Sequence, residues 1–168
     1  MPTEQVTNLR VSMVTSGDPR FPAEHMLDGT TKSFWISTGL FPQEFIISLP
    51  GPHVIKKITL WSMKAAEWTI SRSSSDKPFD FDEIYSEDIE DTPDQTLQIT
   101  SFSVSYSDAH RAAAAKHLKF TLRRGYNDFV AVHRIVIMGE PDVIRDDEKE
   151  RGDEEERVGR VVMVGGRD

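Results

Sequence analysis

The residues best suited to chemistry lie at positions 22–35, where a carboxylate and a hydroxyl stand five positions apart. Asp28-Gly29 predicts a tight turn on which the aspartate side chain and neighbouring carbonyl groups can converge, and Ser33 adds the hydroxyl. Calcium accepts such a set because it is a hard cation that prefers oxygen ligands. The same residues suit an ordinary turn held by hydrogen bonds to the Asp28 side chain, and spacing alone leaves both interpretations open.

Patterns typical of catalysis or transition-metal binding are scarce. The chain has no cysteine, and its five histidines form no His-x-His or His-Glu-x-x-His motif, so thiol catalysis and zinc sites have little support. No Gly-x-Ser-x-Gly motif and no glycine-rich phosphate loop occurs. The acidic stretch 80–85 lacks the glycine and the final bidentate acid of an EF-hand, so we expect a solvated hairpin or loop there. We therefore expect a protein that is not an enzyme.

The charge is unevenly distributed along the 168 residues, whose formal net charge is −8. Residues 76–94 hold nine acids and one base, residues 141–168 hold ten acids and six bases, and the remainder is +4. Nucleic-acid binding requires clustered lysine and arginine, so we expect no nucleic-acid partner. No signal peptide and no apolar run of the roughly 20 residues that span a bilayer is found, so we expect an intracellular chain without membrane insertion.

Apolar and polar residues alternate in short segments that are separated by turn residues, a pattern that predicts an antiparallel all-β domain. The strands of this domain must position the candidate ligands Asp28 and Ser33. Pro50-Gly51-Pro52 is expected to end the first clear strand, because proline cannot donate to a ladder. Residues 108–117, with four consecutive alanines, form the only helix-like stretch. About eight strands with one short link indicate a jelly-roll β-sandwich over residues 1–140. The expected strands are 45–49, 54–62, 68–72, 97–104, 118–123 and 129–138.

The alternation stops after Gly139, and residues 141–168 are dominated by charge. Such a segment cannot bury enough apolar surface to offset its conformational entropy. We expect it to be a disordered charged tail.

Several segments resemble known families. The Asp-Gly-x-x-x-Ser-x-Trp pattern that runs from Asp28 to Trp35 is similar to a loop that often holds structural calcium in galactose-binding-like, or discoidin-type, jelly rolls. Together with residues 35–47, 73–81 and 128–133, it resembles the intraflagellar transport protein 25 family, also known as heat-shock protein beta-11. The resemblance covers residues 5–140, and its most specific part is Thr-Gly-x-Phe-Pro-Gln-Glu-Phe.

The resemblance implies a non-enzymatic subunit of the intraflagellar transport B complex, located in the cilium or flagellum and the cytoplasm. It implies a heterodimer with a Rab-like small GTPase, intraflagellar transport protein 27. It also implies calcium held by the side chains of Asp28 and Ser33 and by carbonyl groups around His25 and Thr30. Sugar-binding relatives often add a glutamate on the last strand, where this chain has Arg134, and Ser33 replaces the commoner threonine, so we expect weak calcium binding.

The partner surface implied by the resemblance is expected at residues 38–43, where an apolar tip lies between the calcium-type loop and the next strand. Exposed apolar tips on polar domains commonly mark contacts. A loop folded down to cap one end of the sandwich is the alternative, and the sequence leaves both open. The predicted GTPase-binding residues are Thr38, Gly39, Leu40, Phe41, Pro42, Gln43 and His133.

Two other functions compete. A discoidin-like module for carbohydrates or lipid headgroups needs aromatic and basic side chains that converge on the loops, and only Tyr126 and Arg123-Arg124 qualify. A small heat-shock chaperone needs a C-terminal Ile-x-Ile motif, and Ile135-Val136-Ile137 fits that string but reads as a core strand.

Overall fold

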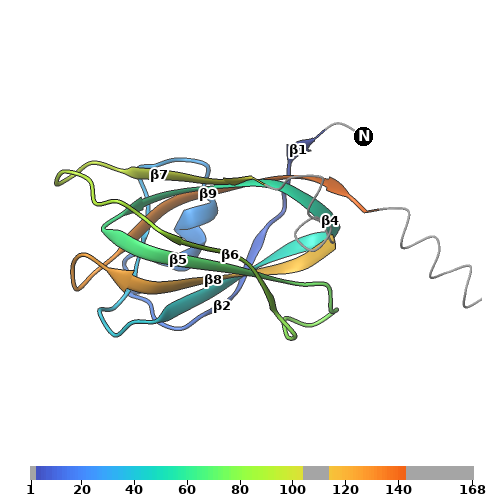
Figure 1. The fold of residues 1–168 in the computed structure, drawn as a ribbon, viewed down its shortest axis with the longest axis horizontal. Coiled ribbons are helices and arrows are strands. Elements are labelled where there is room, and N and C mark those ends of the chain that lie inside the picture. The colour runs from blue at the N-terminus through green and yellow to red at the C-terminus, as the bar shows by residue number, and fades with distance from the viewer. Residues whose placement is uncertain (1–2, 104–113, 143–168) are drawn as a thin grey trace, which may run out of the picture.

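The computed structural model describes residues 3–103 and 114–142, which form nine strands and one short 3-10 helix. Every strand pair is antiparallel, so the predicted all-β jelly-roll sandwich is confirmed (Figure 1). The tail predicted over residues 141–168 lies, after Asp142, outside the described residues. In chain order the elements are β1 (Glu4–Gln5), β2 (Arg10–Val14), η1 (Ala23–Leu27), β3 (Trp35–Ile36), β4 (Gln43–Met63), β5 (Ala65–Ser73), β6 (Asp82–Asp88), β7 (Gln98–Ser103), β8 (Ala114–Gly125) and β9 (Ala131–Pro141).

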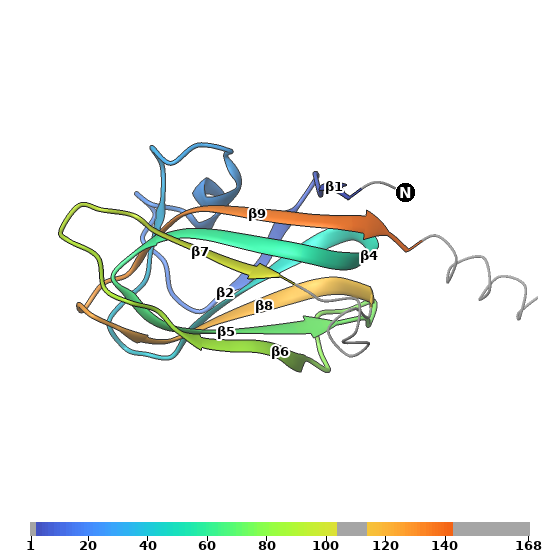
Figure 2. The same cartoon turned by 45° about the horizontal axis from the view of Figure 1, so that its top comes forward.

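The strands form two layers that share one long strand, as Figure 2 shows. Residues 43–48 of β4 pair with β2 and β8. β8 pairs in turn with β5, and β5 pairs with β6. Residues 53–63 of β4 pair with β9 on one side, and residues 57–62 pair with β7 on the other. The short strands β1 and β3 both lie on the outer edge of β9. β4 therefore crosses from one layer to the other and ties the two together.

The crossing occurs at Pro50-Gly51-Pro52, which we expected to end a strand. The chain remains extended there, so the expectation that the strand ends was wrong. The expected loss of ladder hydrogen bonds is confirmed, because the pairing of β4 with β8 breaks between Ser48 and His53. Proline removes the amide donors, and the broken ladder lets the chain change layers without reversing direction.

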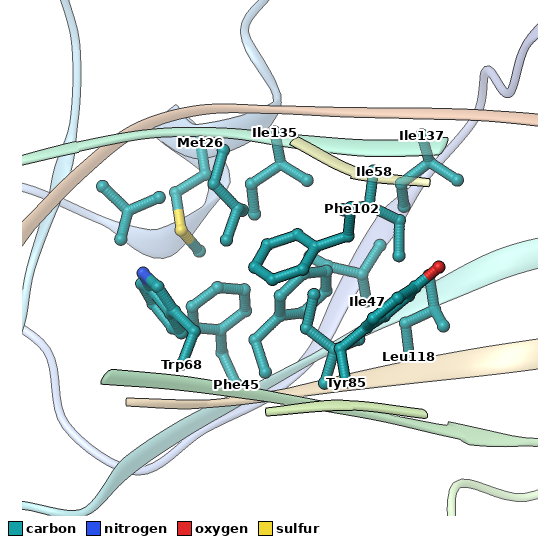
Figure 3. Packing of buried hydrophobic residues seen from close by; sticks show 14 of the residues in the cluster. Met26, Phe45, Ile47, Ile58, Trp68, Tyr85, Phe102, Leu118, Ile135 and Ile137 are labelled. Carbon is teal, nitrogen blue, oxygen red and sulfur yellow. The ribbon is translucent and has the colours of Figure 1, made fainter. Parts of the chain in front are cut away.

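Aromatic side chains fill the space between the layers (Figure 3). The Phe45 ring stacks on Phe120 with centroids 4.9 Å apart and meets Trp68 edge-on at 6.0 Å. Complete burial of one such side chain contributes about 1.5–3 kcal/mol. The alternation predicted for residues 54–62 is confirmed in part: Ile58 and Leu60 are fully buried and Lys57 is exposed, but Thr59 is also buried, with 9% of its surface exposed.

Two segments differ from expectation. Residues 80–85, expected as a solvated hairpin or loop, lead into strand β6, which forms a hairpin with β5 but buries Ile84 and Tyr85 against the core. Residues 114–117 of the alanine-rich stretch begin β8 instead of a helix, because Ala115 pairs with β4 and is fully buried. Cross-strand pairing and burial override the helix propensity of alanine. Residues 108–113 of that stretch lie outside the described residues.

Within the described ranges, no helix combines the length and apolar character needed to cross a bilayer.

Candidate functional site

The loop predicted to hold calcium begins where η1 ends. The Asp28 backbone N–H donates to the carbonyl of His25 at 3.3 Å, which turns the chain back on itself. Gly29 follows with φ of 77°, a left-handed conformation that glycine adopts without a steric penalty. The Asp-Gly pair therefore forms the tight turn that the sequence predicts.

This turn brings three oxygen atoms together. Ser33 Oγ lies 3.1 Å from Asp28 Oδ2 and 3.4 Å from the His25 carbonyl oxygen. One hydroxyl proton cannot satisfy both acceptors, so the cluster has more lone pairs than protons. Ligands at right angles around an ion with bonds of about 2.4 Å lie roughly 3.4 Å apart, so these separations suit calcium.

Other features limit the number of ligands that the oxygen atoms of Asp28, Ser33 and His25 can offer to calcium. Thr30 Oγ1 accepts a hydrogen bond from the Lys32 backbone N–H at 3.1 Å, so this side chain caps a local turn. Arg134, where the resemblance led us to look for a further glutamate ligand, holds its guanidinium over the Trp61 ring at 5.0 Å. In the described part of the chain, no group of three or more His, Asp or Glu side chains could hold a metal. Asp28 would be the single carboxylate, which favours weak binding because few charges face the ion.

Gln43 supports the loop predicted to contact a partner. Its side chain is buried, donates to Thr38 Oγ1 at 3.0 Å and to the Leu40 carbonyl, and accepts from Thr15 Oγ1 at 2.7 Å. The Thr38 backbone N–H also donates to Ser16 Oγ at 3.3 Å. Gln43 therefore fixes the shape of residues 38–42 from below and has little surface for a partner.

The apolar tip divides into an exposed residue and an anchored one. Leu40 is 82% exposed, whereas the half-buried Phe41 packs against the core, where a Cβ added at Gly125 would lie 2.8 Å from its ring. Both interpretations of the sequence therefore describe a part of this loop: Phe41 caps the sandwich and Leu40 projects from it.

A second loop, which the sequence reasoning missed, adjoins this tip. A Cβ at Gly39 would lie 2.5 Å from the carbonyl oxygen of Asp128, so the backbones of residues 38–42 and 126–130 touch. The second loop exposes 64% of Phe129 and 45% of Tyr126. We assigned Phe129 to a strand, but β9 begins at Ala131, and the missed signal was Gly125-Tyr126-Asn127-Asp128, a run typical of turns.

His133, predicted with the partner loop, lies instead against the calcium-type loop. Its Nδ1 donates to the Thr31 carbonyl at 2.8 Å, and its ring lies 4.9 Å from Phe34. Phe34 stacks in turn on Phe21 at 4.9 Å. His133 therefore fastens residues 31–34 to β9.

Known proteins and solved structures resemble this chain in sequence and in fold. No family model matches it. Intraflagellar transport protein 25 of Chlamydomonas reinhardtii is 34% identical over 129 residues, which are 77% of this chain and 64% of that protein. The homologs in Mus musculus and Homo sapiens are 30% and 32% identical over 129 residues, which cover 85% of each. The chain belongs to the intraflagellar transport protein 25 family. It spans less than two thirds of the length of the Chlamydomonas member.

Solved structures agree on the fold of this family member. The family 32 carbohydrate-binding module of Clostridium perfringens NanJ, solved with galactose, matches 82% of the chain and 99% of the module, with a TM-score of 0.67 and 13% identity. A chitosan-binding module from a Paenibacillus chitosanase matches 80% of this chain and 96% of its own, with a TM-score of 0.62 and 16% identity. At these identities the likeness establishes the galactose-binding-like jelly roll alone.

A base on β8 and a base in the turn between β4 and β5 neutralise part of the acidic segment 76–94. Arg124 pairs with Glu67 at 2.9 Å and with Asp88 at 3.0 Å, and these contacts raise its pKa. Lys64 pairs with Asp91 at 3.0 Å, which raises the lysine pKa. Arg124, one of the two arginines named for a headgroup site, is thus engaged within the domain.

The other side chains named for a headgroup or sugar site are also engaged. Arg123 Nε donates to Thr69 Oγ1 at 2.8 Å, and the Tyr126 hydroxyl donates to the Ile89 carbonyl. No observation on the described residues thus favours the discoidin-type alternative over the intraflagellar transport role.

Proposed function

We propose that this chain is a non-enzymatic subunit of the intraflagellar transport B complex that forms a heterodimer with a Rab-like small GTPase, intraflagellar transport protein 27. Its family membership supports a transport role in the cilium or flagellum, and we extend the location to the cytoplasm. The observation that carries the GTPase contact is the pair of adjoining loops, which expose Leu40 and Phe129 at one end of the sandwich.

Two properties suit these loops to protein binding. Apolar side chains that project from a fixed backbone bury their area without the entropy loss of ordering a flexible loop. The Gln43 hydrogen bonds and the packing of Phe41 fix the backbone on one side, and contact with residue 128 fixes it on the other. The proposed contact residues are therefore Thr38, Gly39, Leu40 and Pro42, with Phe129 and Tyr126 added from the second loop.

The test replaces the exposed leucine and spares the anchored phenylalanine. Leu40→Asp places a charge where an apolar contact is proposed, and loss of a buried leucine costs about 1.5–3 kcal/mol, or about 10- to 150-fold in affinity. Phe41→Asp is the poorer choice because that ring packs on the core. We expect the co-expressed GTPase to be lost from the purified Leu40→Asp chain while thermal unfolding is unchanged.

Phe79→Asp is the matched control. Phe79 is 54% exposed, and it follows β5 in the β5–β6 connection, at the opposite end of the sandwich from the β8–β9 loop (Figures 1 and 2). The control should retain the GTPase at the wild-type ratio. Equal recovery of the GTPase by both variants would remove residues 38–42 from the interface.

We also propose that calcium binds weakly at the turn after η1. The side chains of Asp28 and Ser33 and the His25 carbonyl converge there, and the carbonyl of Thr30 would complete the protein ligands. When bound, the ion would neutralise Asp28 and hold the turn closed. Isothermal titration with calcium should give a heat of binding for the wild-type chain and none for Asp28→Asn. Absence of heat in the wild-type chain refutes the site.

A further inference from the structure

The outer edge of β9 carries two short strands with a space between them. β1 pairs with Met138 and Gly139, and β3 pairs with Ala131 and Val132. One further hydrogen bond extends the first pairing, from the Val6 backbone N–H to the Ile137 carbonyl at 2.8 Å. No strand of the described chain pairs with residues 133–136 on this side of β9.

The main chain of Ile135 faces this space. Backbone groups of a strand alternate between its two neighbours, and the carbonyl of Ile137 faces β1. Two residues earlier, the N–H and the carbonyl of Ile135 therefore point to the same side, while those of Val136 point to Thr59 of β4. Among the described residues, none forms a hydrogen bond with the Ile135 main chain on its outer side. The edge thus presents one unused donor and acceptor.

A cavity of about 340 Å³ opens at this point, a volume at the lower end of the range for ligand pockets. Ile135 and Arg134 line it together with Leu9, Leu27, Gln5 and Asn8. The lining combines apolar side chains with amide donors and one cation, as a site for a polar residue of a peptide requires.

Arg134 supplies the charge. Its guanidinium stacks on Trp61, and its Nε is buried without a hydrogen-bond partner. No carboxylate of the described residues forms an ion pair with it. A buried donor without a partner is costly, so an acceptor supplied from outside would be bound favourably.

We propose that this cavity binds a carboxylate-bearing residue of an extended peptide segment, which adds to the β9 edge between β1 and β3. The main chain of the segment exchanges hydrogen bonds with the N–H and carbonyl of Ile135, and its carboxylate pairs with Arg134. The carboxylate can be an acidic side chain or the C-terminus of the segment, because both present the same acceptor. This site is separate from the Leu40 and Phe129 loops, so it serves a peptide contact other than the proposed GTPase face.

The experiment follows the Ile135 amide of the full chain by NMR. The probes are acetyl-Val-Glu-Val-amide and acetyl-Val-Val with a free C-terminus, each added to about 10 mM because binding of one residue is weak. The controls are acetyl-Val-Gln-Val-amide and acetyl-Val-Val-amide. We expect saturable shifts of the Ile135 amide with at least one acidic probe, and the probe that binds shows whether the carboxylate comes from a side chain or from a C-terminus. The uncharged control of that probe should bind about tenfold more weakly.

Arg134→Gln should weaken binding of the acidic probe about tenfold, whereas Arg10→Gln, an exposed arginine on β2 in the other layer, should leave it unchanged. Without peptide, the Ile135 amide should exchange with deuterium faster than that of Val136. The proposal fails if no probe shifts the Ile135 amide, if charged and uncharged probes bind alike, or if Ile135 is as protected as Val136.

Discussion

Gly39→Ala tests whether the two apolar loops form one rigid surface. A Cβ at this position would lie 2.5 Å from the Asp128 carbonyl oxygen and 3.2 Å from its carbonyl carbon and Cα. All three atoms are backbone, so no side-chain rotation can relieve the clash. The added methyl group must therefore push residues 38–42 away from the β8–β9 loop.

The loss of stability in Gly39→Ala follows from overpacking at the contact between residues 39 and 128. An extra methyl group in a well-packed contact destabilises a protein by about 1–3 kcal/mol. Against this, replacing glycine by alanine reduces the entropy of the unfolded chain and stabilises by about 0.4–1 kcal/mol where the site is open. A net loss of about 1.3 kcal/mol, the difference between the midpoints of these ranges, corresponds to a fall of about 3–5 °C in Tm for a chain of this size.

Gly51→Ala is the matched control, since a Cβ at Gly51 would meet nothing within 4 Å. Calorimetry should therefore give changes of opposite sign: a lower Tm for Gly39→Ala and an equal or slightly higher Tm for Gly51→Ala. Gly39→Ala should also recover less GTPase on co-purification, because the two loops no longer present one face. A wild-type Tm in Gly39→Ala would refute the close contact between residues 39 and 128.

Two further predictions concern single polar groups. Gln43→Ala should lower the free energy of unfolding in urea by about 1–3 kcal/mol, because the Leu40 carbonyl loses its side-chain donor and Thr15 loses one of its partners; a wild-type urea midpoint would contradict this role. Hydrogen bonds from Arg20 lower the pKa of Asp18 from 3.8 to about 2. Because the folded pKa is depressed, the stabilisation is complete above pH 4 and declines toward pH 2, so Tm values of the wild-type chain and Asp18→Asn should converge as pH falls; a constant difference would contradict it.

Local patterns predicted what depends on neighbours in sequence. The shared core face of Ile58 and Leu60 follows from the period of a strand, and the meeting of Asp28 with Ser33 follows from one tight turn. Both features are complete within a few residues, so the sequence contains the information that determines them. The same logic located the apolar tip at residues 40–42, but it left open whether the tip projects or caps the sandwich, and the structure shows that Leu40 projects while Phe41 packs against the core.

Features made by residues distant in sequence could not be predicted in this way. Phe129 joins the Leu40 surface only because β3 and β9 pair, which brings residue 39 against residue 128. The space beside Ile135 exists because two strands of two residues each occupy only the ends of one edge. Alanine propensity likewise favours a helix at residues 114–117, but pairing with β4 makes this segment a strand.

The short strand β3 lies between the calcium-type turn and the loop of residues 38–42. Its anchoring decides whether a movement at the turn can shift that loop. Trp35 is fully buried and donates from Nε1 to the Ser16 carbonyl at 3.0 Å. Ser37 is held to Val130 twice, by its backbone N–H at 2.9 Å and by its hydroxyl at 3.2 Å. A segment held this firmly does not transmit a small movement of Asp28 to Leu40, because packed elements shift between discrete arrangements or not at all. Calcium, if bound at Asp28 as proposed, would therefore stabilise the turn around residues 28–34 without changing the Leu40 surface, and the Asp28→Asn chain should co-purify with as much GTPase as the wild-type chain.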